Sequence, residues 1–387
     1  MATGSDHVKL AVIGGGISGL IFARILQNHG QVVVIFEREP SRDSRTQGGT
    51  LDLHAESGQW ALQQAGLFAE FQAMTREGGQ DFRIIDKTGF AHWEEVSPPG
   101  DMDRPEVDRP ALRALLLDSL HSDTIQWGHH LVAIEPIGRQ GHRLRFADGT
   151  TATADVVIGA DGARSRVRPL VTEAQPSYCG CSYFEMRIPD ADRSHPDVAK
   201  FVGRGSLFAL GDNKGIVAQR NGDGGIRAYA TCRVPENSLS HFGEAWSSAA
   251  ASRQAVAYLF QGWAPEIISL INACDGTLAP RPVTALPVGI KWSSQPAVTL
   301  LGDAAHLMSP FAGEGANLAM QDGAELALEL VKASDPAEAI AAYEAKMFER
   351  AEPAAEQSAQ GLDMCISPNG AERMAQMFRR MSEMGEP

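Results

Sequence analysis

A glycine-rich turn between two apolar segments is the feature that most constrains the fold of this chain. Residues 8–13 form a short apolar run, and a G-x-G-x-x-G pattern follows at residues 14–19. Residues 20–30 have helical apolar spacing, and a second apolar run, residues 32–36, stops at Glu37. This order of strand, tight turn, helix and strand predicts a parallel βαβ unit whose helix begins at the glycines.

The residue types in this unit suit an adenine dinucleotide. Gly14 permits the tight turn, Gly16 lets a pyrophosphate approach the backbone, and Gly19 lets the helix pack close to the strand. The helix N-terminus offers unpaired N–H groups to the phosphates, and the Glu37 carboxylate can accept hydrogen bonds from ribose hydroxyls. The motif alone does not separate FAD from NAD. The candidate cofactor contacts here are Gly14, Gly16, Ser18, Gly19, Glu37 and Arg38.

Composition and charge narrow the classes of partner. The chain has 387 residues, 43% hydrophobic and 21% charged, as a globular protein with a large core would have. Its net charge of −14 disfavours nucleic acid, and no apolar stretch is long enough to span a membrane. The five cysteines lack C-x-x-C spacing, and no apolar signal region opens the sequence. We therefore expect a cytoplasmic monomer that binds a small molecule and holds no metal.

Two further motifs follow apolar runs later in the chain. Residues 155–158 lead into the segment 159–168, which reads G-A-D-G-A-R-S-R-V-R. Residues 297–301 lead into G-D-A-A-H at residues 302–306. Soon afterwards comes P-F-A-G-E-G-A-N, which opens a helix that we expect to end near Lys332. Cofactor motifs are thus spread along the chain, which predicts a discontinuous cofactor domain.

In this order and at these separations, the three segments resemble the group A flavin monooxygenases, which share the fold of para-hydroxybenzoate hydroxylase. The resemblance implies that Asp161 serves FAD and NAD(P)H binding, that Asp303 holds the ribityl chain, and that backbone N–H groups of residues 313–317 meet the flavin N1/O2 edge. The corresponding candidates are Asp161, Asp303, Pro310, Gly313, Gly315, Ala316 and Asn317.

The chain departs from the family pattern at two positions, Ser309 in place of a common Pro and Glu314 in place of a common Gln. A carboxylate beside N1/O2 would oppose the negative charge of reduced flavin. We therefore expect Glu314 to point away from the flavin or to be neutralised.

Residues 48–54 (GGTLDLH) and 108–113 (DRPALR) are similar to segments of the tetracycline-inactivating flavin monooxygenases, the tetracycline destructases. That match implies FAD contacts for Asp52 and Arg109 and a nicotinamide-nucleotide contact for Arg45. Physical reasoning also singles out Arg109, because the dipole of the helix that it opens disfavours a cation in the first turn. A bound phosphate or polar cofactor group would explain its position.

The predicted fold class is α/β: a Rossmann-type FAD-binding domain with an inserted mixed-sheet substrate domain and a C-terminal helical segment. The expected boundaries are 1–78, 101–177 and 281–332 for the FAD-binding domain, 79–100 and 178–280 for the substrate domain, and 333–387 for the C-terminal segment. Within these, residues 280–287 are interpreted as a crossover linker. Strand alternation assigns polar faces to the second domain, and the candidate substrate contacts there are Glu185, Arg227 and Tyr229.

Two helices are expected near the C-terminus. The first begins at Asp335-Pro336 and is predicted to reach Ala351. The second, residues 371–384, is Met-rich and is either an amphipathic helix packed on the body or an adaptable lid over a substrate entrance.

The family resemblance implies a reaction in which NADPH reduces FAD, O₂ adds at flavin C4a, and the resulting hydroperoxide gives one oxygen to an electron-rich substrate. Because the reactive group belongs to the cofactor, no catalytic acid or base is assigned. The favoured function is oxidation and inactivation of tetracyclines. The alternatives are a hydroxylase of another phenol or aromatic polyketide, and a non-catalytic flavin-binding redox sensor.

Overall fold

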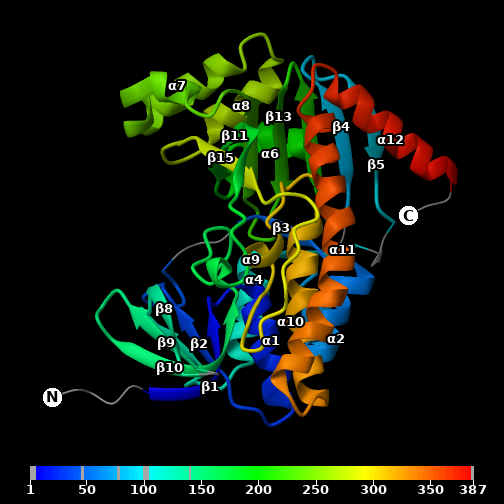
Figure 1. Cartoon of the computed structure of the whole chain (residues 1–387). Helices are drawn as coiled ribbons and strands as arrows, with labels where there is room; N and C mark the ends of the chain where they lie inside the picture. The colour runs from blue at the N-terminus through cyan, green and yellow to red at the C-terminus, as the bar shows by residue number, and fades with distance from the viewer. Residues whose placement is uncertain (1–5, 45–47, 76–78, 99–103, 139–140, 385–387) are drawn as a thin grey trace.

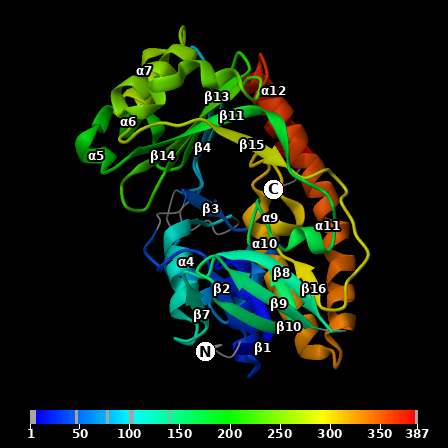
Figure 2. The same ribbon diagram turned by 60° about the vertical axis from the view of Figure 1, so that its left-hand side comes forward.

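The computed structural model describes residues 6–44, 48–75, 79–98, 104–138 and 141–384. Two sheets form two layered units, one above the other, and one long helix runs beside both of them (Figure 1). Figure 2 shows the same two units from the side, with the N-terminus at the end of the lower one.

The first sheet has the order β7-β2-β1-β10-β9-β8, with β16 paired to β10 outside this path. Strands β7, β2, β1, β10 and β16 pair in parallel, whereas β9 and β8 add an antiparallel extension. Helices α1 (Ile17–Asn28) and α10 (Glu314–Lys332) pack together in its core. The strands are β1 (Asp6–Ile13), β2 (Val34–Glu37), β7 (Ile125–Trp127), β8 (Leu131–Ile137), β9 (Gly141–Phe146), β10 (Thr151–Gly159) and β16 (Val298–Leu300).

The second sheet is mixed and has the order β15-β11-β14-β13-β12-β4-β5. All pairs are antiparallel except β12 with β4, so the hairpin of β4 and β5 joins strands from much later in the chain. Its strands are β4 (Phe82–Asp86), β5 (Ala91–Glu95), β11 (Ser177–Ile188), β12 (Ser206–Gly211), β13 (Lys214–Arg220), β14 (Ile226–Arg233) and β15 (Arg281–Ala285).

The structure corrects the interpretation of residues 280–287 as a linker. Residues 281–285 form β15, which pairs with β11 at the edge of the second sheet, so they do not belong to the first sheet as the expected boundary implied. Pro282 obscured the strand in the sequence, because proline lacks the N–H that a central strand must donate. An edge strand tolerates that loss.

One face of the second sheet is covered by helices α6 (Pro196–Val202), α7 (Ala249–Leu259) and α8 (Pro265–Ala273), and on the other face strands β11 and β14 carry polar side chains. Phe184, Met186 and Ala228 point into a core with these helices. These three helices therefore cap this face of the sheet. The alternate residues of β11 and β14 lie on the opposite face.

The long helix α11 (Pro336–Cys365) extends fourteen residues beyond the predicted end at Ala351 and contains Pro353. The ring of Pro353 lies on the exposed side, while Ala351, Ala354 and Ser358 continue the buried stripe at helical spacing. Packing along that stripe outweighs the single lost backbone hydrogen bond. A second helix, α12 (Gly370–Met384), follows it. Within the described ranges, neither these helices nor any other has the length and apolar character needed to cross a membrane.

Candidate flavin-binding site

The three glycines of the β1–α1 turn differ in what surrounds them. Gly14 has φ +106°, and a Cβ there would lie 2.4 Å from the Ala160 carbonyl oxygen. At Gly19 a Cβ would lie 2.6 Å from the carbonyl oxygen of Gly14. At Gly16 the nearest atom would be the Ala160 oxygen, 3.9 Å away. The first and third glycines are thus required by the protein's own packing, and the second borders open space at the N-terminus of α1.

Glu37 closes this turn from the end of β2. Its side chain accepts hydrogen bonds from the backbone N–H groups of Gly15 (2.5 Å) and Glu39 (2.9 Å), and the residue is buried. Each carboxylate oxygen has a second lone pair that can still accept from a ribose hydroxyl. Arg38 instead points outward, with its Nε 3.8 Å from Glu39, whereas Ser18 is buried in the first turn of α1.

Arg168 links the segment 159–168 to the G-D-A-A-H segment at residues 302–306. It is 2% exposed, and its Nε and Nη2 donate to the carbonyl oxygens of Ala304 (2.7 Å) and Asp303 (2.9 Å). Two further bonds reach Ala163, and burial lowers the pKa of the guanidinium. This role of Arg168 cannot be predicted from the sequence, because nothing in the R-S-R-V-R run marks which arginine is buried.

The carboxylate of Asp161 turns inward, toward its own loop. It accepts a 2.6 Å hydrogen bond from the Arg166 N–H, and burial raises its pKa. The side chain of Asp303, by contrast, is exposed at the start of α9 (Asp303–His306). Of these two predicted contacts, Asp303 is the one whose carboxylate can reach a bound molecule directly.

A buried charge network holds the Asp303 segment from behind. Asp322 of α10 is fully buried and accepts hydrogen bonds from the Gly302 N–H, from His306 Nε2 and from Arg350 Nη2, each at 2.7 Å. Burial alone would raise the pKa of Asp322, but His306 and Arg350 outweigh it and lower that pKa to about 2. The segment that carries Asp303 is thereby fixed to α10 and α11.

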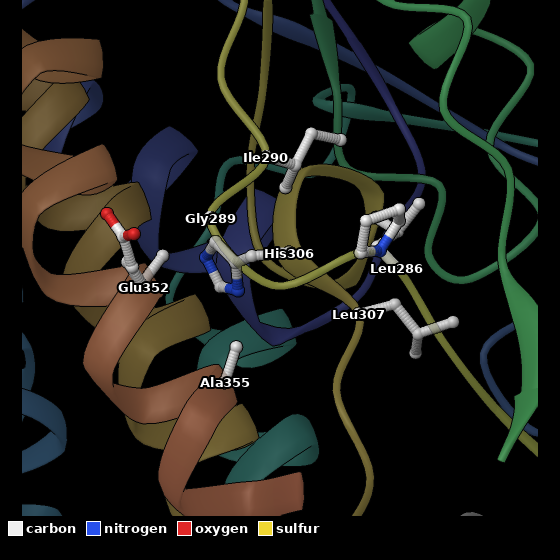
Figure 3. Close-up of a pocket in the computed structure, with 9 residues that line it drawn as sticks. Leu286, Gly289, Ile290, His306, Leu307, Glu352 and Ala355 are labelled. Carbon is white, nitrogen blue, oxygen red and sulfur yellow. The ribbon is translucent and has the colours of Figure 1, made fainter.

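His306 faces α11 (Figure 3). Its ring lies beside Glu352 and Ala355 of α11 and the segment that contains Gly289 and Ile290 (Figure 3). The hollow that these residues line has a volume of about 10 Å³, room for about one water and too little for a substrate or a nicotinamide. His306 therefore supports the cofactor motif from the α11 side.

The N-terminus of α10 is held against β3 (Thr50–Asp52). The buried Asn317 donates from Nδ2 to the Asp52 carbonyl oxygen (2.9 Å) and accepts at Oδ1 from the His54 N–H (3.0 Å). Gly313, at φ +73°, caps the helix, and a Cβ at Gly315 would meet nothing within 4 Å. A second patch of open space therefore adjoins this helix N-terminus.

The loop before α10 is fixed by α11. Ser309 Oγ donates to the Ser358 carbonyl oxygen at 2.8 Å, and a Cβ at Gly361 would lie 2.5 Å from the Phe311 carbonyl oxygen. The serine that departs from the family pattern therefore contributes a buried hydrogen bond. Pro310, which lies between Ser309 and Phe311 in the chain, is exposed.

Arg109 opens α4 (Arg109–Asp118), next to the ribbon of β3 and β6 (Glu106–Asp108). Its backbone N–H bonds to the Gly49 oxygen, and its side chain passes under Gly48, where a Cβ would lie 3.0 Å from Cδ. Among the described residues, the buried Arg109 Nε has no hydrogen-bond partner. Arg45, predicted as a nicotinamide-nucleotide contact, lies outside the described residues.

The three predicted substrate residues lie together on the polar face of the second sheet. Arg227 Nη1 donates to Glu185 Oε1 at 2.9 Å, and Tyr229 pairs with Glu185 across β14 and β11. A Cβ at Gly49 would lie 3.5 Å from Arg227 Cβ and 3.6 Å from the Tyr229 oxygen. It would also lie 3.0 Å from the amide oxygen of Gln219, which the sequence analysis did not single out. This polar face therefore meets the residues that lead into β3.

These features fit a flavin dinucleotide. Gly16 and Gly315 border open space at two helix N-termini, where phosphates and a flavin anion are stabilised. The exposed Asp303 carboxylate and the unpartnered Arg109 Nε supply an acceptor and a donor beside them. Comparison with known proteins decides the family: the family described as "FAD binding domain" matches residues 7–206 and 291–358.

The chain belongs to this FAD-binding family. A full-length relative, the monooxygenase asqM of Emericella nidulans, is 30% identical and aligns over 95% of this chain and 97% of that protein. The chain is therefore an FAD-dependent monooxygenase of the hydroxylase family.

Two solved structures share the fold of this flavoprotein monooxygenase. Klebsiella pneumoniae HpxO in complex with FAD and uric acid has a TM-score of 0.78 and 22% identity, covering 97% of this chain and 93% of that chain. The tetracycline destructase Tet(55) has a TM-score of 0.76 and 21% identity, covering 97% of this chain and 95% of that chain. The predicted fold class and the resemblance to group A flavin monooxygenases are thus confirmed.

Proposed function

We propose that the first sheet and its helices form the FAD-binding domain and that the second sheet forms the substrate domain. In this proposal the turn at Gly14–Gly19 and Glu37 hold the adenosine and pyrophosphate, Asp303 holds the ribityl chain, and residues 313–317 face the flavin ring. Arg109 and Asp52 contact the cofactor from the opposite side, and Asp161 and Asn317 position the loops. The open space at Gly16 and Gly315 and the unpartnered Arg109 Nε support this arrangement.

Bound FAD would accept a hydride from NADPH, activate O₂ and supply one oxygen atom to the substrate. The tasks of the protein are then to orient the substrate and to exclude water from the reacting centre. The polar face of β11 and β14 is suited to orientation, because Glu185 and Arg227 fix each other's side chains in a partly buried ion pair. Tyr229 beside them adds a hydroxyl whose pKa burial raises, so it remains a neutral donor at physiological pH.

We propose tetracyclines as the substrate class of this monooxygenase. The observation that carries this proposal is the juxtaposition of Arg227 and Tyr229 with Gly49, inside the GGTLDLH segment that resembles the tetracycline destructases. The shared fold with Tet(55) supports the same choice. A tetracycline presents an ionised enol system, which an arginine and a phenol can bind through charge-assisted hydrogen bonds.

A second candidate is an electron-rich oxygenated heterocycle. The HpxO structure contains uric acid, whose neighbouring N–H and C=O groups would match a carboxylate paired with a guanidinium. The two substrate classes depend on Glu185 differently. A heterocyclic N–H would donate a hydrogen bond to a Glu185 oxygen, whereas an enolate has no proton to donate there.

The deciding experiment follows NADPH consumption by the FAD-loaded protein with chlortetracycline or uric acid, together with the absorbance of each compound. Coupled loss of NADPH and of the tetracycline chromophore supports the first proposal. Loss of NADPH with an intact chromophore rejects tetracycline as substrate, and coupled loss with uric acid selects the heterocycle. No NADPH loss with any aromatic ligand would favour the redox-sensor alternative.

Replacing Asp303 with alanine is expected to lower FAD retention, because the exposed carboxylate at the start of α9 would no longer hold the ribityl chain. About tenfold weaker binding would correspond to the loss of roughly 1.4 kcal/mol, typical of a hydrogen bond to a charged group. Glu356→Ala removes an exposed acid from α11 and serves as the control. Full FAD retention by Asp303→Ala after gel filtration would remove Asp303 from the site.

Truncation after Gly370 is expected to raise the substrate KM more than it lowers the FAD content. Helix α12 packs on β4, β12 and β5, where Phe378 lies 5.1 Å from the ring of Phe82, and Phe82 lies 4.8 Å from Phe208. Phe82 and Phe208 share the sheet face of Glu185, so α12 covers one end of the proposed substrate surface. An unchanged KM with every accepted substrate would leave α12 as a packing helix.

A further inference from the structure

A histidine lies between two carboxylates beside the N-terminus of α10. The side chain of His54 is 8% exposed, with Nε2 3.3 Å from Asp52 Oδ2 and Nδ1 3.6 Å from Glu314 Oε1. Asp52 ends β3 and Glu314 is the first residue of α10. Among the described residues, this cluster is not arranged to hold a metal ion. Its chemistry is therefore that of the imidazole and the two acids.

The geometry favours a protonated ring. Both neighbours are carboxylates, which accept hydrogen bonds and do not donate when ionised, and only imidazolium has an N–H on each side. The hydrogen bond that His54 donates to Asp52 raises the pKa of His54 most, burial opposes it, and the charges of Asp52 and Glu314 add to the increase. Two other charged groups face the cluster: Arg104 opposes the charge on His54, and Glu56 opposes ionisation of Glu314.

Glu314 is an unusual neighbour for a reduced flavin. The partial positive charge at a helix N-terminus stabilises a nearby anion. An ionised acid in the first turn would compete with the reduced flavin for that stabilisation. Burial raises the pKa of Glu314, and the charge of His54 offsets only part of that rise. A carboxylate at this place without a compensating cation would oppose the addition of electrons to a nearby flavin.

We propose that His54 is a fixed cation that neutralises Glu314, so that the N-terminus of α10 remains available to the negative charge of reduced FAD. This inference rests on the proposed placement of the flavin ring at residues 313–317. His54 acts through Glu314 and is a positioning residue. A purely mechanical role is already filled by Asn317, which bonds the His54 N–H and the Asp52 carbonyl oxygen and so fastens β3 to α10.

The test is a double-mutant cycle on the reduction potential of bound FAD at pH 8. His54→Gln keeps a polar side chain but removes the cation, and it is expected to make two-electron reduction about tenfold less favourable, a fall of about 30 mV. Glu314→Gln is expected to leave the potential unchanged or slightly higher. The double variant is expected to lie closer in potential to Glu314→Gln than His54→Gln lies to the parent chain, because Asp52 is then the only acid of the cluster left without its cation.

His92→Gln is the matched control, since His92 also pairs with an aspartate, Asp86 at 3.0 Å, but on the second sheet. It is expected to leave the potential unaltered. The proposal is overturned if His54→Gln retains FAD with an unchanged potential, or if the double variant shows the same fall as His54→Gln alone.

A second measurement needs no cofactor. In the apoprotein, NMR titration of the His54 ring is expected to show loss of its proton at lower pH in Glu314→Gln than in the parent chain, and at lower pH still in Asp52→Asn. An unshifted titration in Glu314→Gln would contradict the pairing itself. Failure of the protein to bind FAD would instead reject the proposed cofactor site, so the two failures are distinguishable.

Discussion

Replacing Asp322 with asparagine is expected to lower the free energy of unfolding by about 3–5 kcal/mol, because it leaves the buried His306 without its carboxylate and takes one of two carboxylates from Arg350. His306 and Arg350 both donate to Asp322 at 2.7 Å, and the side chains of His306 and Asp322 are at most 3% exposed, so little solvent can replace the lost charge. Asparagine offers one acceptor oxygen in place of the two of Asp322, so the Gly302 N–H would compete for it with His306 and Arg350. Because Gly302 precedes Asp303, we also expect FAD to dissociate at a lower temperature than from the parent protein.

Glu325→Gln provides the matched control for Asp322. Glu325 lies on the same helix and accepts from the same arginine at 2.6 Å, but its side chain is 15% exposed and remains in reach of water. Its replacement is expected to cost less than about 1 kcal/mol, as for other solvent-accessible ion pairs. Equal losses in thermal melts of the two variants would show that burial does not set the cost.

The pH dependence of the Asp322 effect follows from its lowered pKa. The pKa falls from 3.8 to about 2 on folding, so the carboxylate contributes stability above pH 3.8 and loses it as the pH falls through about 2. The contribution of the Asp322 carboxylate to the difference between the parent chain and Asp322→Asn is therefore expected to shrink below pH 4. Burial lowers the pKa of His306, but Asp322 raises it above its usual value, so between pH 7 and pH 5 the difference is expected to grow as His306 gains its proton. Urea unfolding at pH 5 and pH 3 therefore measures the part due to the carboxylate. A difference that grows at pH 3 would contradict the assignment.

The parts of the fold that the sequence predicts are those set by local pattern. The apolar runs before Gly14, Gly159 and Gly302 each end in a turn, and all three become parallel strands of one sheet. Residues 281–285 were not predicted as a strand because β15 is an edge strand that pairs with β11 alone and contains a proline. The end of α11 was not predicted because the continuation of this helix past Pro353 depends on tertiary packing, and a local sequence pattern carries no information about that packing.

The residues of the candidate site also fall into two groups, those that a local sequence pattern predicts and those that it does not. Glycines and acids with a fixed spacing, such as Gly16 and Asp303, are visible in the sequence, since their function depends on local backbone geometry. Arg168, Asp322 and His54 are not, because each acts through its side chain on another element of the fold: Arg168 and Asp303 are 135 positions apart, and Asp322 bonds the Gly302 N–H from 20 positions away. The sequence does carry one hint, since an acid at position 314 is expected either to point away from the flavin or to be neutralised, and His54 has the position to neutralise it.

Gly16→Ala is expected to weaken FAD binding by about tenfold or more, roughly 1.4 kcal/mol, without changing the stability of the apoprotein. The new methyl group would meet no protein atom closer than 3.9 Å, and φ at this position is not in the left-handed region, so the turn itself can accept alanine. The methyl would occupy the space through which a pyrophosphate reaches the N–H groups of α1. Titration of the apoprotein with FAD, alongside its thermal melt, measures both effects.

The neighbouring glycines make this test specific, because the same substitution should act there through the protein itself. In Gly14→Ala the Cβ would lie 2.4 Å from the Ala160 carbonyl oxygen at a φ of +106°, and in Gly19→Ala it would lie 2.6 Å from the Gly14 oxygen. Each is expected to destabilise the apoprotein by about 1–3 kcal/mol through backbone displacement. If Gly16→Ala lowered the apoprotein melting temperature as much as Gly14→Ala does, its glycine would be a packing requirement, and the open space beside it would not be the pyrophosphate site.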